Sequence, residues 1–415
     1  MRAIFFTGKG GVGKTTLAAA TAARLASAGN KVLVVSTDPA HSLGDAFGVA
    51  LGMRPTELAA GLFAGHVDAR ALTDDAWQQL RGYLAALLSG VGVADIDAEE
   101  LTVLPGVEEL LALAEVQRLA DSGAWQVLVV DCGPTAETLR LLALPEAFAG
   151  YLRKLFPDDK RALRGVLSRL AMRRGGLGGG LDRGRETSVE NLGATTDALV
   201  ELGHRLTALH ELLTAEDTSV RLVLTPERVV VAETRRTLTA LALQGIAVDG
   251  VIANRVVPRS SKWRGPAAKW MRLRRAEQDA VLADLRADSD LPIRLVEHAA
   301  SEPVGVPALL ALAQQLYGDE DPRNGQALQA PLLSVTGGGR GADVEYRLRI
   351  AVPLGADATP DLARIGDDLA VTVDGRRRLI ALPSVLRRCD VLGAEFDQAG
   401  VVVRLAPRQG GGEQW

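Results

Sequence analysis

Cysteine is scarce in this sequence: Cys132 and Cys389 are the only two among 415 residues. Two cysteines so far apart make neither a disulfide framework nor, by themselves, a four-sulfur metal site. No uninterrupted apolar run of about 18 residues occurs, so no direct membrane span is expected. The first predicted strand begins almost at the initiator methionine, which leaves no room before it for a signal peptide. These absences predict a cytoplasmic protein that would contact a membrane only through a partner.

Charge of one sign is not in excess either. The 47 Lys and Arg residues against 51 Asp and Glu residues give a net charge of -4. This balance argues against a nucleic-acid partner and against disorder. Hydrophobic residues make up 47% and charged residues 24%, as in folded soluble proteins. A chain of this length is expected to form two domains, or one large domain with an appendage.

Short apolar runs alternate with helical patterns over the first three hundred residues. Near-continuous apolar runs are typical of parallel strands buried on both faces. Strand followed by helix, repeated, predicts an α/β fold with a doubly wound, mostly parallel sheet. The predicted strands are Ala3–Phe6, Val32–Val35, Val127–Val130, Val220–Leu224 and Gly250–Ala253, and the helical patterns cover Thr15–Ala28, Val107–Leu119, Thr196–Leu213 and Val229–Leu243.

Two stretches interrupt this rhythm and suggest the domain boundaries. A glycine-rich stretch near 157–190 indicates the tip of a helical insertion at about 145–215 within a first domain of residues 1–318. Residues 319–342 are predicted to be a linker. Residues 343–407 alternate polar and apolar side chains around an Asp374-Gly375 turn, which predicts a separate all-β sandwich.

The strongest motif is G-x-x-x-x-G-K-T, which begins at Gly8 between a predicted strand and a helix. Glycines allow consecutive N–H groups to curl around phosphates, and the following helix presents its positive end. Lys14 would contact the β- and γ-phosphates, and the Thr15 hydroxyl would ligate Mg²⁺. The alternative is a chance glycine-rich turn. The predicted nucleotide-binding residues of the loop are Gly8, Lys9, Gly10, Gly11, Val12, Gly13, Lys14, Thr15 and Thr16.

Lys9 is unusual, because an ordinary phosphate loop does not require lysine there. The pattern K-G-G-x-G-K-T resembles the deviant Walker A ATPases, which include the nitrogenase iron protein, the septum-site and plasmid-partition ATPases and the arsenical-pump ATPases. The resemblance implies that Lys9 reaches across a dimer to the partner's nucleotide, where phosphoryl transfer favours an additional cation. The alternative is a solvated charge beside the loop.

Two acidic residues follow predicted strands. Asp38 comes after Val32–Val35, and an acid at the carboxyl end of a strand near the phosphate loop faces the γ-phosphate crevice. Asp38 would therefore orient the attacking water or hold magnesium; the alternative is a helix N-cap. Asp131 comes directly after Val127–Val130, the Walker B arrangement, and is predicted to be a magnesium residue together with Thr15.

Two longer stretches resemble the arsenical-pump-driving and tail-anchored-protein-targeting ATPases. Ser36–Phe47 is similar to their switch I and Asp131–Leu142 to their switch II, except that Ala136-Glu137 stands where the family often has Gly-His. The resemblance assigns Asp38 to polarising the water. It also implies that Asn254 contacts adenine, whose edge an amide can match as donor and acceptor; the alternative is a turn residue.

Other features depart from that family or leave alternatives open. The chain has one phosphate loop, no cysteine cluster for a metalloid and no Cys-x-x-Cys pair for a dimer-bridging zinc. Residues 343–407 resemble the small-heat-shock-protein-like domain fused to some bacterial arsenical-pump ATPase homologues. Arg228 serves the dimer or the switches, or is a surface charge. The basic segment Arg259–Arg275 is interpreted as a solvated amphipathic helix rather than a surface for nucleic acid or lipid.

Together these patterns predict a homodimeric switch ATPase that uses ATP and Mg²⁺ and couples nucleotide state to binding or delivery of a protein client. A membrane-protein partner fits equally well. The alternatives are the motor subunit of a metalloid efflux system and a chaperone-like adaptor that uses nucleotide as a signal.

Overall fold

The computed structural model describes ten segments of the chain: residues 1–38, 42–67, 107–133, 207–259, 264–287, 291–325, 333–337, 345–352, 358–397 and 400–407. The chain divides into two compact units, Met1–Ala3 with Leu25–Asp217 and Ile4–Arg24 with Thr218–Trp415. Most of the predicted helical insertion lies outside the described residues. Of its range, residues 207–214 are described as helical.

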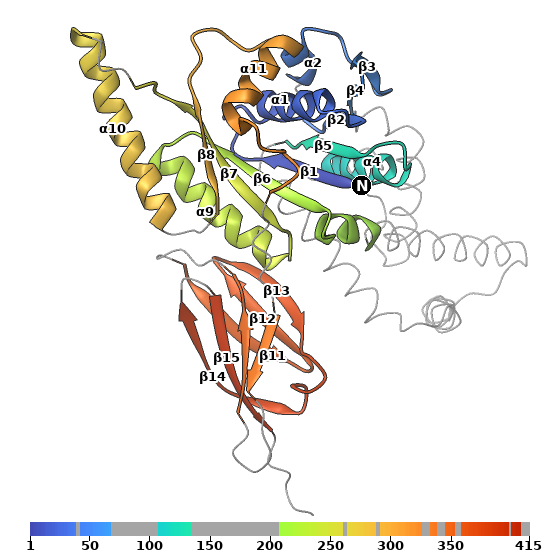
Figure 1. The fold of residues 1–415 in the computed structure, drawn as a ribbon. Coiled ribbons are helices and arrows are strands. Elements are labelled where there is room, and N and C mark those ends of the chain that lie inside the picture. Colours follow the sequence, from blue (N-terminus) through green and yellow to red (C-terminus); the bar gives the residue numbers. More distant parts are fainter. Residues whose placement is uncertain are drawn as a thin grey trace, which may run out of the picture. The chain divides into compact units, whose positions relative to one another are not determined.

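The central element is an eight-stranded sheet with the order β3-β4-β2-β5-β1-β6-β7-β8 (Figure 1). Strand β2 pairs in parallel with β4 and β5, β7 pairs in parallel with β6 and β8, and β3 is antiparallel to β4. This topology confirms the predicted α/β fold with a mostly parallel sheet. The strands are β1 (Arg2–Thr7), β2 (Val32–Ser36), β3 (Thr56–Ala59), β4 (Leu62–His66), β5 (Val127–Asp131), β6 (Thr218–Leu224), β7 (Val248–Val256) and β8 (Ile293–Glu297).

In the first unit, β2 and β5 are buried along their entire lengths. Their sequences, VLVVS and VLVVD, are apolar until the last residue, which is the pattern of strands covered on both faces. Helix α2 (Ser42–Phe47) packs against β2, and helix α4 (Val107–Asp121) precedes β5. Both strands therefore end in a polar residue at the carboxyl edge of the sheet.

In the second unit, helices flank β6, β7 and β8. Helix α1 begins at Lys14, α9 packs on β6 and β7, α10 packs on α9, and α11 packs on β8. Figure 1 shows α1 and α11 together on one side of these strands and α9 on the other. Their bounds are α1 (Lys14–Ser27), α9 (Arg228–Leu243), α10 (Pro266–Ala287) and α11 (Val306–Tyr317).

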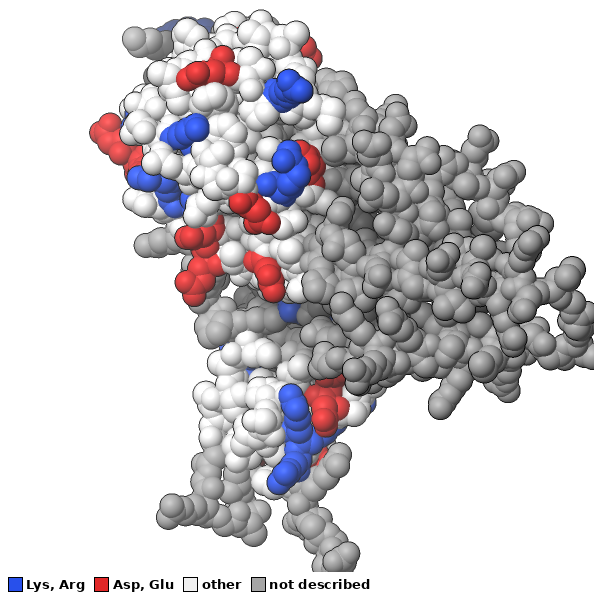
Figure 2. All heavy atoms as spheres, turned by 90° about the vertical axis from the view of Figure 1, so that its right-hand side faces the viewer, with Lys and Arg blue, Asp and Glu red and all other residues white. Residues whose placement is uncertain are grey.

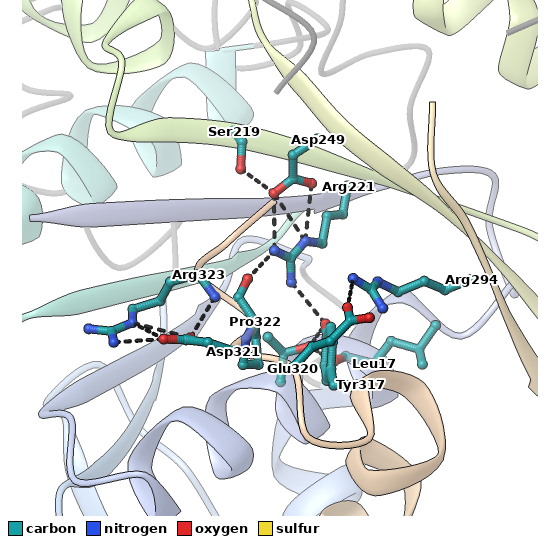
Figure 3. Close-up of polar contacts among 11 residues, drawn as sticks. Leu17, Ser219, Arg221, Asp249, Arg294, Tyr317, Glu320, Asp321, Pro322 and Arg323 are labelled. Carbon is teal, nitrogen blue, oxygen red and sulfur yellow. Dashed lines mark hydrogen bonds and ion pairs between the residues drawn. The ribbon is translucent and has the colours of Figure 1, made fainter. Parts of the chain in front are cut away.

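A buried ion pair explains the one charged residue in the apolar run of β6. The Arg221 side chain is 7% exposed and the Asp249 side chain 0%, and Nη2 of Arg221 lies 3.0 Å from Oδ2 of Asp249 (Figure 3). Ser219 Oγ also donates to Asp249, at 2.7 Å. Nη1 of Arg221 donates to the Tyr317 hydroxyl at 2.9 Å. Burial by itself would lower the pKa of Arg221, but Tyr317 and Asp249 outweigh it and raise the pKa above its ordinary value.

The network continues into α1. The Thr21 hydroxyl donates to the Leu17 carbonyl at 2.7 Å, so at its 2.7 Å contact with Tyr317 the tyrosine hydroxyl is the donor. Tyr317 thus accepts from Arg221 and donates to Thr21. A continuous chain of hydrogen bonds connects β7, β6, α11 and the helix that follows the glycine loop.

The C-terminal residues form two antiparallel sheets, as predicted. One has the order β14-β15-β10-β9 and the other β11-β12-β13. Their inward side chains, among them Leu348, Val371 and Val403, are fully buried in one cluster. Asp374 (φ 51°) and Gly375 (φ 76°) are both left-handed and join β12 to β13, the conformation that favours Asp-Gly. The strands are β9 (Leu333–Gly337), β10 (Tyr346–Ile350), β11 (Pro360–Ile365), β12 (Asp368–Val373), β13 (Arg376–Ala381), β14 (Cys389–Asp397) and β15 (Gly400–Pro407).

One strand of this region lies in the segment that the sequence assigns to the linker. Residues Leu333–Gly337 pair antiparallel with β10, Ile350 opposite Leu333 and Tyr346 opposite Gly337. A Cβ at Gly337 would lie 2.4 Å from the carbonyl oxygen of Glu345, so glycine is required where the strand ends.

Two further observations concern the charge of the surface and the hydrophobicity of the helices. On the face in Figure 2, basic and acidic side chains of the described residues alternate and are separated by uncharged surface. No helix within the described segments is long and apolar enough to cross a membrane.

Candidate nucleotide site

The glycine loop lies between the end of β1 and the start of α1, as its motif predicts. Gly11 (φ 78°) and Gly13 (φ 96°) are left-handed, a conformation that other residues rarely adopt. A Cβ at Gly8 would lie 2.1 Å from the Val223 carbonyl oxygen, and one at Gly13 would lie 2.3 Å from Nδ2 of Asn254. Among the described residues, no atom lies within 4 Å of a Cβ placed at Gly10 or Gly11. The loop is thus tightly packed at Gly8 and Gly13 and open in its middle, which fits a cradle for phosphate.

The two lysines of the loop differ in their surroundings. Lys14 is 6% exposed, and its ammonium donates to the main-chain carbonyl of Lys9 at 3.3 Å. The Lys9 side chain is 45% exposed, and its Nζ lies 3.7 Å from Oε2 of Glu233 on α9. Lys14 therefore points back into its own loop, whereas the charged end of Lys9 lies toward α9 and solvent.

Asn254 contacts the glycine loop directly. Its Nδ2 donates to the Val12 carbonyl at 2.8 Å, and its Oδ1 accepts from the main-chain N–H of Arg255 at 2.8 Å. Arg255 is left-handed, with φ 57°. Both ends of the amide are thus engaged with main chain, so the structure gives Asn254 a role as a support of the loop that the sequence did not predict.

The two predicted acids lie at the ends of neighbouring strands. Register pairs Ser36, the last residue of β2, with Asp131, the last residue of β5. The Ser36 hydroxyl donates to Oδ2 of Asp131 at 3.0 Å and accepts from the N–H of Asp38 at 3.2 Å. Asp131 is 0% exposed. Ser36 therefore links the main chain of Asp38 to the carboxylate of Asp131.

Sequence reasoning assigned no individual role to Ser36 or Glu233, although Ser36 begins the stretch that resembles switch I. The signal for Ser36 was available, because a polar residue ends an apolar strand next to Asp38. No comparable signal marks Glu233, since its proximity to Lys9 depends on how α9 packs. Arg228 is exposed at the start of α9. The basic segment is helical from Pro266, as predicted.

Several predicted features lie outside the described residues. These are residues 39–41 of switch I and residues 134–142 of switch II. Among the residues that are described, no group of three or more His, Cys, Asp or Glu side chains is arranged to hold a metal ion. Thr15 in the first turn of α1 and Asp131 at the end of β5 supply a hydroxyl and a carboxylate, oxygen donors of the kind that Mg²⁺ prefers.

A glycine loop that follows a buried strand and opens a helix, in a mostly parallel sheet, defines a P-loop nucleotide-binding protein. The family described as anion-transporting ATPase matches residues 1–318, and the HSP20-like domain found in ArsA matches residues 343–405. The chain therefore belongs to the anion-transporting ATPase family and is an ATPase.

Three relatives cover between 63% and 98% of this chain. A Mycobacterium tuberculosis protein is 39% identical over 98% of this chain and 96% of its own length. A Chlorobaculum tepidum protein, provisionally named an arsenical pump-driving ATPase, is 34% identical over 92% of this chain and 90% of its own length. The ATPase get3 of Aspergillus niger is 31% identical over 63% of this chain and 75% of its own length.

Proposed function

We propose that the chain is a homodimeric switch that binds ATP with Mg²⁺, hydrolyses it between two subunits, and couples the nucleotide state to binding or delivery of a protein client. The observation that carries this proposal is the position of Lys9. Its carbonyl is held by Lys14 inside the loop, while its ammonium lies outside the loop and half exposed. A lysine so placed is available to a nucleotide on a facing subunit.

Each predicted residue has a physical role in this account. The open middle of the loop at Gly10 and Gly11 receives the phosphates, and Lys14 contributes a fixed positive charge to them. Thr15 and Asp131 would hold Mg²⁺, which neutralises charge on the phosphates when it is bound. Asp38 accepts a hydrogen bond from the attacking water and so orients it. Lys9 of the facing subunit stabilises the charge that develops on the departing phosphoryl group.

The choice between a protein client and a metalloid is considered from the relatives and from the cysteine content of the chain. One of the relatives is named ATPase get3 and another is provisionally named an arsenical pump-driving ATPase, and these names alone do not decide between a protein client and a metalloid. The sequence has two cysteines in total, which is too few for a metalloid cluster made of cysteine thiolates. We therefore favour a protein client over a metalloid.

This function is tested by measuring the mass of the protein in solution with and without ATP. Asp38→Asn should bind ATP and Mg²⁺ but hydrolyse ATP poorly, because the neutral amide orients water less well than the carboxylate. Light scattering should then find a persistent dimer with ATP and a smaller fraction of dimer without it. The matched control is Asp284→Asn, an exposed aspartate of α10, which should behave as wild type. A monomer at every ATP concentration would contradict the dimeric switch.

A further inference from the structure

We propose that Glu233 is a positioning residue for Lys9, which holds the lysine in its own subunit until an ATP-bound partner takes it. This inference rests on the proposed function, because it presumes that Lys9 acts on the nucleotide of a facing subunit. It assigns a role to a residue that lies outside all of the nucleotide-binding motifs.

The contact that motivates the inference joins the glycine loop to α9. Nζ of Lys9 lies 3.7 Å from Oε2 of Glu233, and no other ion pair of Lys9 is found in the part of the chain that the structure describes. The Lys9 main chain is fixed independently through the hydrogen bond from Lys14 to its carbonyl. Glu233 therefore influences where the Lys9 ammonium lies without holding the loop itself.

The strength of this ion pair suits a contact that must break in every cycle. At 3.7 Å it is longer than a charge-assisted hydrogen bond, and its side chains are 45% and 32% exposed. Exposed pairs of this kind shift an equilibrium by about two- to fivefold. The multiply charged phosphates of ATP attract an ammonium more strongly than one carboxylate does. An arriving nucleotide can therefore draw Lys9 away, while in its absence the lysine remains at Glu233.

The contacts of Glu233 indicate that it acts through its negative charge and not by stabilising the fold. Its main-chain carbonyl accepts the Thr237 hydroxyl at 2.9 Å, a helical contact that any residue at position 233 would provide. Its carboxylate is directed at Lys9. Replacing Glu233 with Gln keeps the side-chain shape and the helix but removes the negative charge.

The test measures how tightly subunits associate with a non-hydrolysable ATP analogue and Mg²⁺, by analytical ultracentrifugation over a range of protein concentrations. Glu233→Gln should lower the dimer dissociation constant by about 4- to 25-fold, because in each of the two subunits Lys9 no longer has to leave a carboxylate, and each pair contributes about two- to fivefold. Glu227→Gln is the matched control. Glu227 precedes the same helix and pairs with Arg274 at 2.8 Å, so its loss should leave the dimer unchanged.

A second pair of variants separates this role from a general effect of charge. In the Lys9→Ala background, Glu233→Gln should change nothing, because there is no lysine to release. If Glu233→Gln tightened subunit association equally in the wild-type and Lys9→Ala proteins, the inference would be overturned. It would also be overturned if the Glu233→Gln protein associated as wild type does. If Lys9→Ala itself associates and hydrolyses ATP as wild type, the proposed function fails and the role of Glu233 falls with it. If Lys9→Ala is defective but Glu233→Gln is unchanged, only the role of Glu233 is wrong.

Discussion

The side chain of Asn254 supports the glycine loop from β7: its Nδ2 donates to the carbonyl of Val12 at 2.8 Å. A Cβ at the next residue of the loop, Gly13, would collide with the same amide. Sequence resemblance predicted that Asn254 contacts the adenine base. The observed contact connects it to the main chain of the glycine loop, and the two roles predict different binding behaviour.

Asn254→Ala distinguishes these roles. If Asn254 supports the loop, its loss should weaken ATP, GTP and pyrophosphate by a similar factor, about fivefold for one hydrogen bond. If it reads the base, ATP should weaken while GTP and pyrophosphate are unaffected. Calorimetric titration of the three ligands measures the difference. We expect the uniform loss, and a loss confined to ATP would contradict the supporting role.

Lys14→Ala should lower ATP affinity by about 10²-fold or more, because the nearly buried ammonium is the fixed charge of the loop. Binding of a fluorescent ATP analogue reports the affinity directly. The matched control is Lys269→Ala, an exposed lysine of α10, which should bind as wild type. Wild-type affinity in Lys14→Ala would remove the basis for the phosphate-loop assignment.

Ser36→Ala should alter the magnesium requirement, because Ser36 connects Asp131 to the main chain of Asp38. Loss of a hydrogen-bonding partner of a metal-binding residue typically costs about 10–100-fold in metal affinity. A titration of ATPase activity with Mg²⁺ should therefore need correspondingly more metal, with much of the activity recovered at saturation. Thr56→Ala, on the exposed strand β3, is the control. An unchanged Mg²⁺ dependence would show that the bond from Ser36 to Asp131 is structural only.

Asp249→Ala should destabilise the fold by about 3–5 kcal/mol, because it leaves the Arg221 guanidinium buried without its counter-ion. Replacing both residues, as Arg221→Met with Asp249→Leu, should restore most of that loss, since two apolar side chains need no partner. Asp397→Asn removes an aspartate from an exposed ion pair with Arg349 and should change stability by less than about 1 kcal/mol. Urea unfolding followed by circular dichroism compares the three. A double variant as unstable as Asp249→Ala would argue against this explanation.

Much of this fold is predictable from the sequence, because the buried strands carry their signal in composition. β2 and β5 are apolar on both faces and follow directly from that pattern. Strand β8 could not be predicted in this way. It lies at the edge of the sheet, most of its residues are half-exposed, and its sequence, Ile-Arg-Leu-Val-Glu, mixes charged and apolar residues. β9 escaped prediction for the same reason, since its last three residues are exposed.

The candidate site likewise contains residues that the sequence predicts and contacts that it does not. Motifs with fixed spacing predicted the glycine loop, Asp38 and Asp131, because each of these lies directly after a strand that its apolar composition marks. The contact of Lys9 with Glu233 spans more than two hundred residues, and the support of Val12 by Asn254 does as well. Such pairings depend on how helices and strands pack, and a single sequence does not encode them in any local pattern.

The central claim is that Lys9 acts on the nucleotide of the facing subunit, and mixing two variants tests it most directly. Lys9→Ala and Asp38→Asn subunits should each be nearly inactive alone, because trans-acting cations contribute roughly 10³–10⁵ in rate. In a mixed dimer, one site keeps its own Asp38 and receives Lys9 from the partner. If sites act independently, an equal mixture with random pairing should recover about a quarter of the wild-type ATPase rate. No recovery, with mixed dimers shown to form by differential tagging, would contradict the claim.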